Sequence, residues 1–231
     1  MNNLFFESAY FGTVLTLGSF LIGLKIKQKL KSPLAEPILT SSAIIICILL
    51  IFKIDYNTYQ FSANNITYFL TPVTVSLALP MYRQLETLKT NLAAILISIF
   101  CGCLACALSI FFMSKVLGLS PIIYNSIQPK SVTTAIALGI TKEFGGIEGI
   151  TVISVVITGL LGSMLIKSIC TILKIKSPIA TGLAFGNAAH AIGTTKAIGL
   201  GETQGAMSSL SIAVAGVMTV IIAPIFSGLI K

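Results

Sequence analysis

Long apolar stretches separated by short polar ones run along almost the whole chain. A helix needs about 20 apolar residues to span a bilayer. Leu92 to Met113 is a run of 22 residues without a charge, and Thr203 to Ile230 is uncharged for 28. The apolar windows between charged positions give eight segments, at about residues 4–24, 34–52, 64–82, 92–114, 120–141, 148–170, 178–200 and 205–230. The pattern predicts an all-α polytopic membrane protein with about 7–8 hydrophobic segments.

Three of these segments are interrupted near mid-length by proline, glycine and polar residues. The third contains FLTPVTVSLALP (69–80), the fifth QPKSVTTAIALG (128–139) and the seventh GLAFGNAAHAIGTTKAIGLGE (182–202). A broken helix exposes backbone N–H and C=O groups that lipid cannot satisfy, so it survives only where protein or a wet cavity shields it. We therefore expect broken or re-entrant helices inside the bundle at these three places.

Parts of the chain also resemble one another. Residues 18–39 and 162–184 share a Gly-Ser start, a basic turn and a Lys-Ser-Pro step, which suggests repeat halves at about 13–82 and 155–230. A second internal similarity links TTAIALG (133–139) with TTKAIGLG (194–201). Internal repeats of this kind are typical of secondary transporters.

The orientation of the repeat depends on the stretch 120–145. If this stretch crosses the membrane, the two halves are inverted, as in many transporters. If it is re-entrant, the lysine clusters at 25–31 and 174–176 lie on one side, as the positive-inside rule requires. Both arrangements stay open at this point.

Composition supports a membrane protein. Hydrophobic residues make up 55% of the chain and charged residues 10%, whereas soluble domains carry about 25% charged residues. The formal charge of +8 comes largely from lysines between apolar segments, which is the bias that sets membrane orientation, so we expect no nucleic-acid partner. The start MNNLFFESAY has no basic region typical of a signal peptide, and the first apolar segment is expected to remain in the mature protein.

The polar stretches near 53–65 and 81–91 are too short for a soluble domain, so we expect a single integral membrane domain over residues 1–231. The five cysteines lie in apolar segments without a Cys/His metal spacing, and we interpret them as small buried hydrophobes. In CGCLAC (101–106) no His, Asp or Glu completes a soft-metal site. No hydrolase, P-loop or zinc-protease motif occurs, so we predict neither an enzyme nor a cofactor.

The fifth segment carries the first candidate site. Proline favours the first turn of a helix and Ser or Thr satisfies its free N–H groups, so a half-helix is predicted to start within residues 128–134. A helix N-terminus favours an anion, and Lys130 adds a full positive charge. Ser131, Thr133 and Thr134 would add hydroxyl donors. The alternative is that Lys130 extends from a loop to the membrane surface.

The seventh segment carries the second candidate site. His190 is the only histidine of the chain, and on a helix Asn187 and Thr194 would share its face. Thr195 and Lys196 follow directly. Polar and ionisable groups are costly within a bilayer, so this face is a candidate for substrate binding. The alternative is a packed, hydrogen-bonded histidine without a ligand.

Arg83, Lys196 and Glu202 are secondary candidates. Arg83 lies in the short loop before the fourth segment, where it is either a solvated cation or a contact for a substrate carboxylate. Lys196 and Glu202 follow the histidine in the seventh segment.

Four motifs occur in order along the chain: TPVTVSLALPMYRQ (71–84), QPKSVTTAIALGI (128–140), GGIEGITVISVVITGLLG (145–162) and GLAFGNAAHAIGTTKAI followed by GETQGAMSSLSIAVAGVMT (182–219). With these motifs, from about Pro33 to its end, the chain resembles the LrgB/CidB family of membrane proteins. The chain has Ala135 and Ala189 where the family pattern has Pro and Ser, which weakens a binding role for these two positions.

The resemblance implies a multi-pass protein of the bacterial-type plasma membrane. The family is described as antiholin-like or holin-like, modulating murein hydrolase activity and cell lysis with a small LrgA/CidA-type membrane partner. It is also similar to the C-terminal half of the plant plastid glycolate/glycerate translocator, and relatives have been linked to pyruvate. We therefore expect a carrier of small monocarboxylates (2-oxo or 2-hydroxy acids), with an antiholin-like lysis regulator as the alternative and a homo-oligomer as a further expectation.

Overall fold

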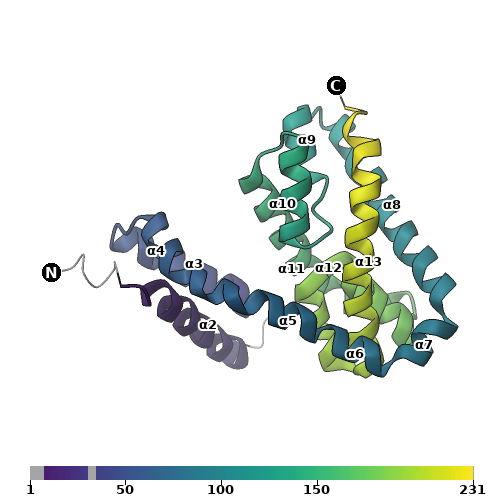
Figure 1. The fold of residues 1–231 in the computed structure, drawn as a ribbon, viewed down its shortest axis with the longest axis horizontal. Helices are drawn as coiled ribbons and strands as arrows, with labels where there is room; N and C mark the ends of the chain where they lie inside the picture. The colour runs from purple at the N-terminus through teal and green to yellow at the C-terminus, as the bar shows by residue number, and fades with distance from the viewer. Residues whose placement is uncertain (1–7, 31–34, 231) are drawn as a thin grey trace. The chain divides into compact units, whose positions relative to one another are not determined.

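The computed structural model describes residues 8–30 and 35–230, which form helices joined by turns and contain no β-strand (Figure 1). The predicted all-α class is confirmed. The chain divides into two compact units, residues 1–76 and residues 77–231. The single membrane domain over 1–231 and its repeat halves stay predictions, and the start of the first apolar segment, residues 4–7, lies outside the described residues.

Unit 1 is a small group of helices around α2. Its α2 packs against α3 and α4, and close contact is allowed by Gly12, whose N–H donates to Ser62 Oγ at 2.7 Å. The carboxylate of Glu36, at the start of α3, pairs with Lys27 Nζ at 3.2 Å. The elements are α2 (Phe11–Leu30), α3 (Pro37–Ile51), α4 (Tyr56–Ala63), η1 (Asn64–Phe69) and α5 (Leu70–Ser76).

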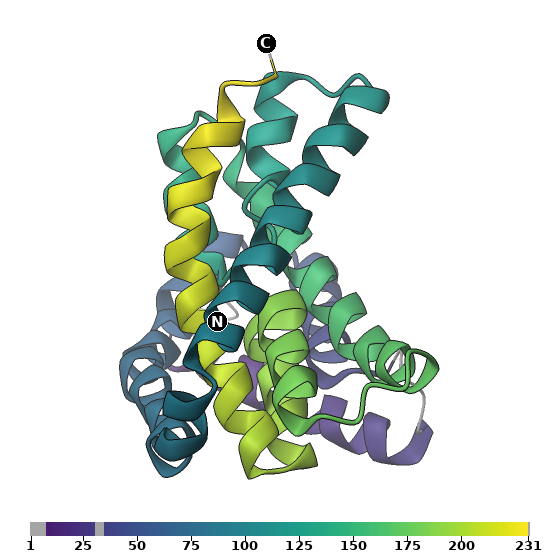
Figure 2. The ribbon, with the colours of Figure 1, turned by 90° about the vertical axis from the view of Figure 1, so that its right-hand side faces the viewer.

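Unit 2 is built around three long helices. Its elements are α6 (Ala78–Arg83), α7 (Leu85–Thr90), α8 (Leu92–Val116), α9 (Pro121–Ile127), α10 (Thr134–Glu143), α11 (Glu148–Ile172), α12 (Pro178–Leu200) and α13 (Glu202–Ser227). Within the described residues, α8, α11 and α13 are the 3 helices long and apolar enough to cross a membrane. Figures 1 and 2 show α8 and α13 running along the unit.

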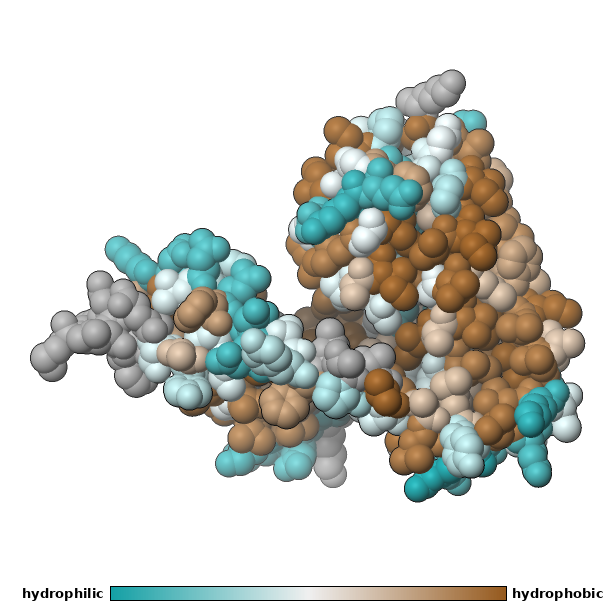
Figure 3. Space-filling view, in the orientation of Figure 1, coloured by the Kyte–Doolittle hydropathy of each residue, from teal (hydrophilic) through white to brown (hydrophobic). Residues whose placement is uncertain are grey.

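The packing of unit 2 agrees with a membrane protein. Ile95 and Ile99 of α8 form a buried core with Ala206 and Met207 of α13. Outside this core, hydrophobic side chains cover most of the visible flank of the unit, and hydrophilic ones gather toward its ends (Figure 3). Such an apolar flank is stable in lipid, where the helical backbone satisfies its own hydrogen bonds.

The helices α9 and α10 form a helical hairpin, hairpin one. Asn125 Nδ2 of α9 donates to the carbonyl of Phe144, just after α10, at 2.8 Å. The N–H of Ile147 donates to Ser126 Oγ at 2.7 Å. The C-terminal end of α10 and the turn after it therefore lie beside α9. The turn at Gly145 has a φ of 68°, a conformation that glycine adopts without strain.

The two halves of α12 form a second hairpin, hairpin two. Its first arm runs from Pro178 to the break at His190, which has non-helical φ and ψ, and its second arm continues to Leu200. The arms fold back on each other, since a Cβ atom at Gly193 would lie 2.4 Å from the carbonyl oxygen of Phe185.

Both arms of hairpin two lie against the same part of α13. Ser211 Oγ donates to the carbonyl of Leu183 in the first arm at 3.3 Å. Thr194 in the second arm shares a hydrogen bond with Ser208 at 2.7 Å. The seventh segment therefore leaves the bundle at the end where it enters.

The two hairpins enter unit 2 from opposite ends. Hairpin one lies along the C-terminal part of α13, where Tyr124 Oη donates to the carbonyl of Phe226 at 3.1 Å. The base of hairpin two lies at the N-terminal part of α13, where a Cβ at Gly182 would approach the carbonyl oxygen of Gln204 to 2.6 Å. In Figure 1, α9 and α10 accordingly occupy the upper part of the unit and α12 the lower part.

The fifth and seventh segments are thus broken inside the bundle, as predicted. The half-helix in the fifth segment begins at Thr134, at the end of the predicted stretch 128–134. Proline has no N–H and cannot continue the hydrogen bonds of α9, so residues 128–133 form turns, in which Lys130 N–H donates to the carbonyl of Ile127 at 3.2 Å.

The third segment runs across the division between the two units, and its last helix, α6, packs against α13 of unit 2. It is divided into η1, α5 and α6, and the side chains of Phe69, Val73 and Leu79 are exposed. Its place inside the bundle stays a prediction, because the division between the two units falls within it, after Ser76.

Candidate binding site at the hairpin tips

The tip of hairpin one, residues 128–133, places an uncapped helix start and a lysine together. Thr133 is the N-cap of α10, but its side chain makes no capping hydrogen bond, so N–H groups in the first turn of α10 are left without that partner. Lys130 and Ser131 precede it in the turn and are half-buried. The tip is anchored by Gln128 Nε2, which donates to the carbonyl of Ala223 at 2.9 Å.

The tip of hairpin two is His190. Its φ of 47° and ψ of −135° lie outside the helical region, and a non-glycine residue held in such a conformation costs about 1–3 kcal/mol. The residue is 4% exposed, and its Nε2 has no hydrogen-bond partner. A buried unpartnered ring nitrogen beside a strained backbone is typical of a functional position.

The two tips meet near the middle of the bundle. His190 interacts with the backbone of Ser131 and with the charge of Lys130. Its Nδ1 would lie 3.6 Å from a Cβ atom at Gly159, near the middle of α11. Lys130 and His190 are 60 positions apart in the sequence. They are brought together because the two hairpins enter from opposite ends of the unit and reach the same level.

The helix α8 forms a further wall at the tips. Cys106 Sγ lies 2.7 Å from Ser131 Oγ of hairpin one. One turn earlier, Cys103 Sγ lies 3.6 Å from Asn187 Oδ1 of hairpin two. These contacts have no strong signal in the sequence, because cysteines inside an apolar helix are usually packed as small hydrophobes.

The predicted common helical face of Asn187, His190 and Thr194 is wrong. The helix breaks at His190, so Asn187 and Thr194 lie in different arms of hairpin two. Asn187 contacts α8, whereas Thr194 Oγ1 donates to the carbonyl of His190 at 2.9 Å and bonds Ser208 of α13. Thr194 therefore supports the tip of hairpin two.

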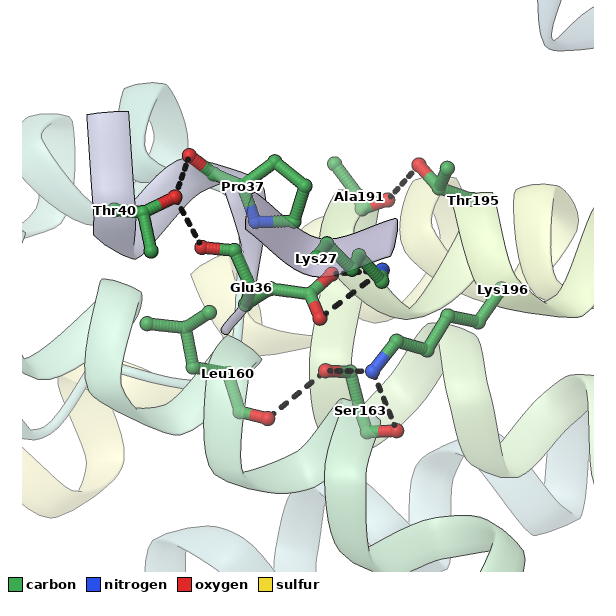
Figure 4. A network of polar contacts seen from close by, with 9 residues as sticks. All are labelled: Lys27, Glu36, Pro37, Thr40, Leu160, Ser163, Ala191, Thr195 and Lys196. Atoms are coloured by element: carbon green, nitrogen blue, oxygen red, sulfur yellow. Dashed lines mark hydrogen bonds and ion pairs between the residues drawn. The ribbon is translucent and has the colours of Figure 1, made fainter. Parts of the chain in front are cut away.

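The remaining predicted residues lie along the second arms. Thr134 begins α10 beside Thr133. Thr195 Oγ1 donates to the carbonyl of Ala191 at 3.1 Å, and Lys196 Nζ donates to the carbonyl and the hydroxyl of Ser163 in α11, at 3.3 and 3.2 Å (Figure 4).

The structure pairs the other two secondary candidates with each other. Arg83 and Glu202 form an ion pair at 3.5 Å, and both side chains are more than half exposed. Glu202 begins α13, directly after the base of hairpin two. The pair therefore lies at the base and not at the tip, so the tip site comprises Lys130, Ser131, Thr133, Thr134 and His190, with Asn187 and Thr194 beside it.

The charges at the tips favour a small anion. The second arm of each hairpin begins there, so two helix N-termini with their partial positive charge converge beside Lys130. The hydroxyls of Ser131 and Thr133 and the imidazole of His190 are further polar groups of the two tips. Within the described residues no group of three or more His, Cys, Asp or Glu side chains is placed to hold a metal ion.

Three membrane-length apolar helices around two opposed hairpins define an integral membrane protein. The LrgB-like family matches residues 16–229, and the chain belongs to this family. Among its relatives, the antiholin-like protein LrgB of Bacillus cereus (strain B4264) is 35% identical over 222 residues, which cover 94% of this chain and 95% of the relative. The antiholin-like protein LrgB of Bacillus anthracis (strain A0248) matches with the same identity and coverage. No solved structure shows a significant match to the chain.

Proposed function

We propose that the protein is a membrane carrier for small monocarboxylates, of the 2-oxo or 2-hydroxy acid class that includes pyruvate, glycolate and glycerate. One observation carries the proposal: two hairpins from opposite ends of unit 2 meet where His190 interacts with the backbone of Ser131 and with the charge of Lys130. Opposed broken helices that meet near the middle of a bundle are the usual substrate site of secondary transporters.

The chemistry of the tips suits this substrate class. A carboxylate would be bound by Lys130 and the free N–H groups at the start of α10, since a charged acceptor strengthens such hydrogen bonds. The oxygen on the neighbouring carbon would be bound by hydroxyls of Ser131 or Thr133 and by His190. The strained, pre-formed backbone of His190 keeps these groups in place before the substrate arrives.

The chain order also supports a carrier. The helix α8 is followed by hairpin one, and α11 by hairpin two, so a pair of one long helix and one hairpin occurs twice along the chain. The echoed sequences TTAIALG and TTKAIGLG lie in the two second arms. We infer that these two helix–hairpin pairs form an inverted repeat. We also infer that the protein is a multi-pass protein of the plasma membrane. Rocking of one helix–hairpin pair against the other would expose the site alternately to each side of the membrane.

Uptake into liposomes tests the proposal. Purified protein should accumulate labelled pyruvate or glycolate, and Lys130→Ala should lower uptake about tenfold or more, because a charged hydrogen bond contributes about 1.5–3 kcal/mol. Lys167→Ala is the matched control, since Lys167 is an exposed lysine of α11 outside the tip site. Equal uptake by Lys130→Ala and the control would refute the role of the site.

The second candidate function is an antiholin-like regulator that acts with an LrgA-type membrane protein. The names of the relatives favour it. It requires a protein contact instead of a substrate, and the apolar flanks of α8 and α13, with Phe112 and Val217 exposed, are suitable surfaces. In cells, lysis control would then survive Lys130→Ala and fail after Phe112→Ser or Val217→Ser, which is the opposite of the pattern that a carrier predicts.

A further inference from the structure

The motif CGCLAC, residues 101–106 in α8, places three thiols in three different surroundings. Cys101 is exposed on the apolar flank. Cys103 is buried, with its Sγ 3.6 Å from Asn187 Oδ1 and 4.0 Å from Thr219 Oγ1. Cys106 is partly buried, with its Sγ 2.7 Å from Ser131 Oγ at the tip of hairpin one.

We propose that Cys106 forms part of the wall of the anion site, so that a small anionic thiol reagent and the substrate compete for the space beside it. This inference rests on the proposed carrier function. Two observations carry it. The thiol touches a tip residue that adjoins Lys130, and His190, which contacts the same tip, is buried with its Nε2 unpartnered. That unpartnered nitrogen indicates a polar ligand or water at the junction.

The reactivity of the three thiols should not follow their exposure. A thiol reacts as the thiolate, which forms in water or beside positive charge and not in lipid. Cys101 is the more exposed residue, but its surroundings on the flank of α8 are lipid in a membrane. Cys106 lies beside a tip that carries Lys130, and Cys103 is enclosed by α13 and hairpin two. Cys106 is therefore the thiol of α8 that a charged reagent can modify.

The probe is 2-sulfonatoethyl methanethiosulfonate, an anion similar in size to the proposed substrates. The Cys106 thiolate attacks the sulfur of the reagent that bears the sulfonatoethyl group, and a new disulfide forms as the bond between that sulfur and the sulfonyl sulfur breaks. Methanesulfinate leaves with the electron pair, and the thiol proton goes to water. The modified residue carries a sulfonate next to Lys130, in the place of the substrate carboxylate.

The test uses three variants of the full chain in liposomes, each retaining only Cys101, only Cys103 or only Cys106, with serine at the other four cysteines. We expect labelling of the Cys106 variant, and at least tenfold slower labelling of the other two. Pyruvate or glycolate should slow labelling of Cys106 several-fold, while chloride at equal ionic strength should not. The cationic trimethylammonium analogue should react more slowly than the anionic reagent, and Lys130→Ala should remove this preference.

Two results would overturn the inference alone: a Cys106 variant that takes up the acid but is labelled no faster than the Cys103 variant, or labelling that the transported acid does not slow. A different result would overturn the substrate assignment alone. In that case Cys106 is labelled with the anionic preference and is protected by another anion, but neither pyruvate nor glycolate is taken up.

Discussion

The amide group of Asn187 lies directly over the backbone of Gly102. A Cβ atom built at Gly102 would lie 1.9 Å from Asn187 Nδ2, and Asn187 Oδ1 is 3.6 Å from Cys103 Sγ. The first arm of hairpin two is thus seated on α8 just before the break at His190. Glycine is required at position 102 for this contact, because any side chain would occupy the place of the amide.

Gly102→Ala should displace the Asn187 side chain without unfolding the protein. The clashing atom is the end of a flexible side chain, which can rotate away at small cost. The contact of Asn187 with Cys103 would be lost, and the tip of hairpin two would no longer be held against α8. We expect substrate uptake to fall several-fold while the thermal midpoint in detergent changes little.

A double-variant cycle separates this effect from a general disturbance of α8. In the Asn187→Ala background the space above Gly102 is free, so Gly102→Ala should cause almost no further loss of uptake. Residues in contact give non-additive effects of this kind. If the losses of uptake caused by the two substitutions were fully additive, the proposed contact between Asn187 and Gly102 would be contradicted.

Substitutions of His190 test whether its backbone is strained and whether its side chain takes part in uptake. At φ 47° and ψ −135° glycine is free of the steric cost that a Cβ atom brings. We expect His190→Gly to be more heat-stable than His190→Ala, by about 1 kcal/mol or more. Both variants lack the imidazole, so both should lose uptake.

Thermal unfolding in detergent and liposome uptake together check this prediction. If His190→Gly were no more stable than His190→Ala, the backbone of residue 190 would not be strained. If both variants kept normal uptake, the imidazole would have no part in the site.

Gly186 tests the packing of hairpin two on α13. A Cβ atom there would lie 2.3 Å from the carbonyl oxygen of Ser208 and 2.7 Å from Ser211 Cβ. Backbone atoms cannot rotate away, so Gly186→Ala should force the helices apart and destabilise the protein by about 1–3 kcal/mol.

Gly199→Ala is the matched control, because it lies in the second arm and a Cβ atom there meets nothing within 4 Å. Alanine should be neutral or slightly stabilising at this position, since it favours a helix over glycine. Equal thermal midpoints for the two alanine variants would contradict the close packing of α12 on α13.

Periodicity and residue type predicted much of this architecture. Runs such as Leu92 to Met113 predict membrane helices because hydrophobic length alone decides spanning. The breaks in the fifth and seventh segments were also predictable, because proline, glycine and polar residues interrupt an apolar run there. The course of each arm beyond its break was not, because it depends on distant contacts such as Tyr124 with Phe226 and Thr194 with Ser208.

The candidate site was predicted only in part. Lys130 and His190 stand out because ionisable groups are rare in apolar segments. Their meeting could not be predicted, since it requires two hairpins of matching depth. The helical face predicted for Asn187, His190 and Thr194 is wrong because the backbone at His190 has a positive φ. Glycine in a sequence suggests such a conformation, whereas histidine does not. Cys106 was missed because its contact with Ser131 comes from a different helix.

Sided cysteine labelling tests most directly the claim that two hairpins enter from opposite faces and meet at Lys130 and His190. Ser126 and Thr141 are buried, so the reporters belong at exposed positions at the base of each hairpin. Single cysteines at Ser120 and Glu143 should react from one side of the membrane, and single cysteines at Lys176 and Gly199 from the other. Labelling of the positions 120 and 143 from opposite sides would mean that the fifth segment crosses the membrane, and it would contradict this account.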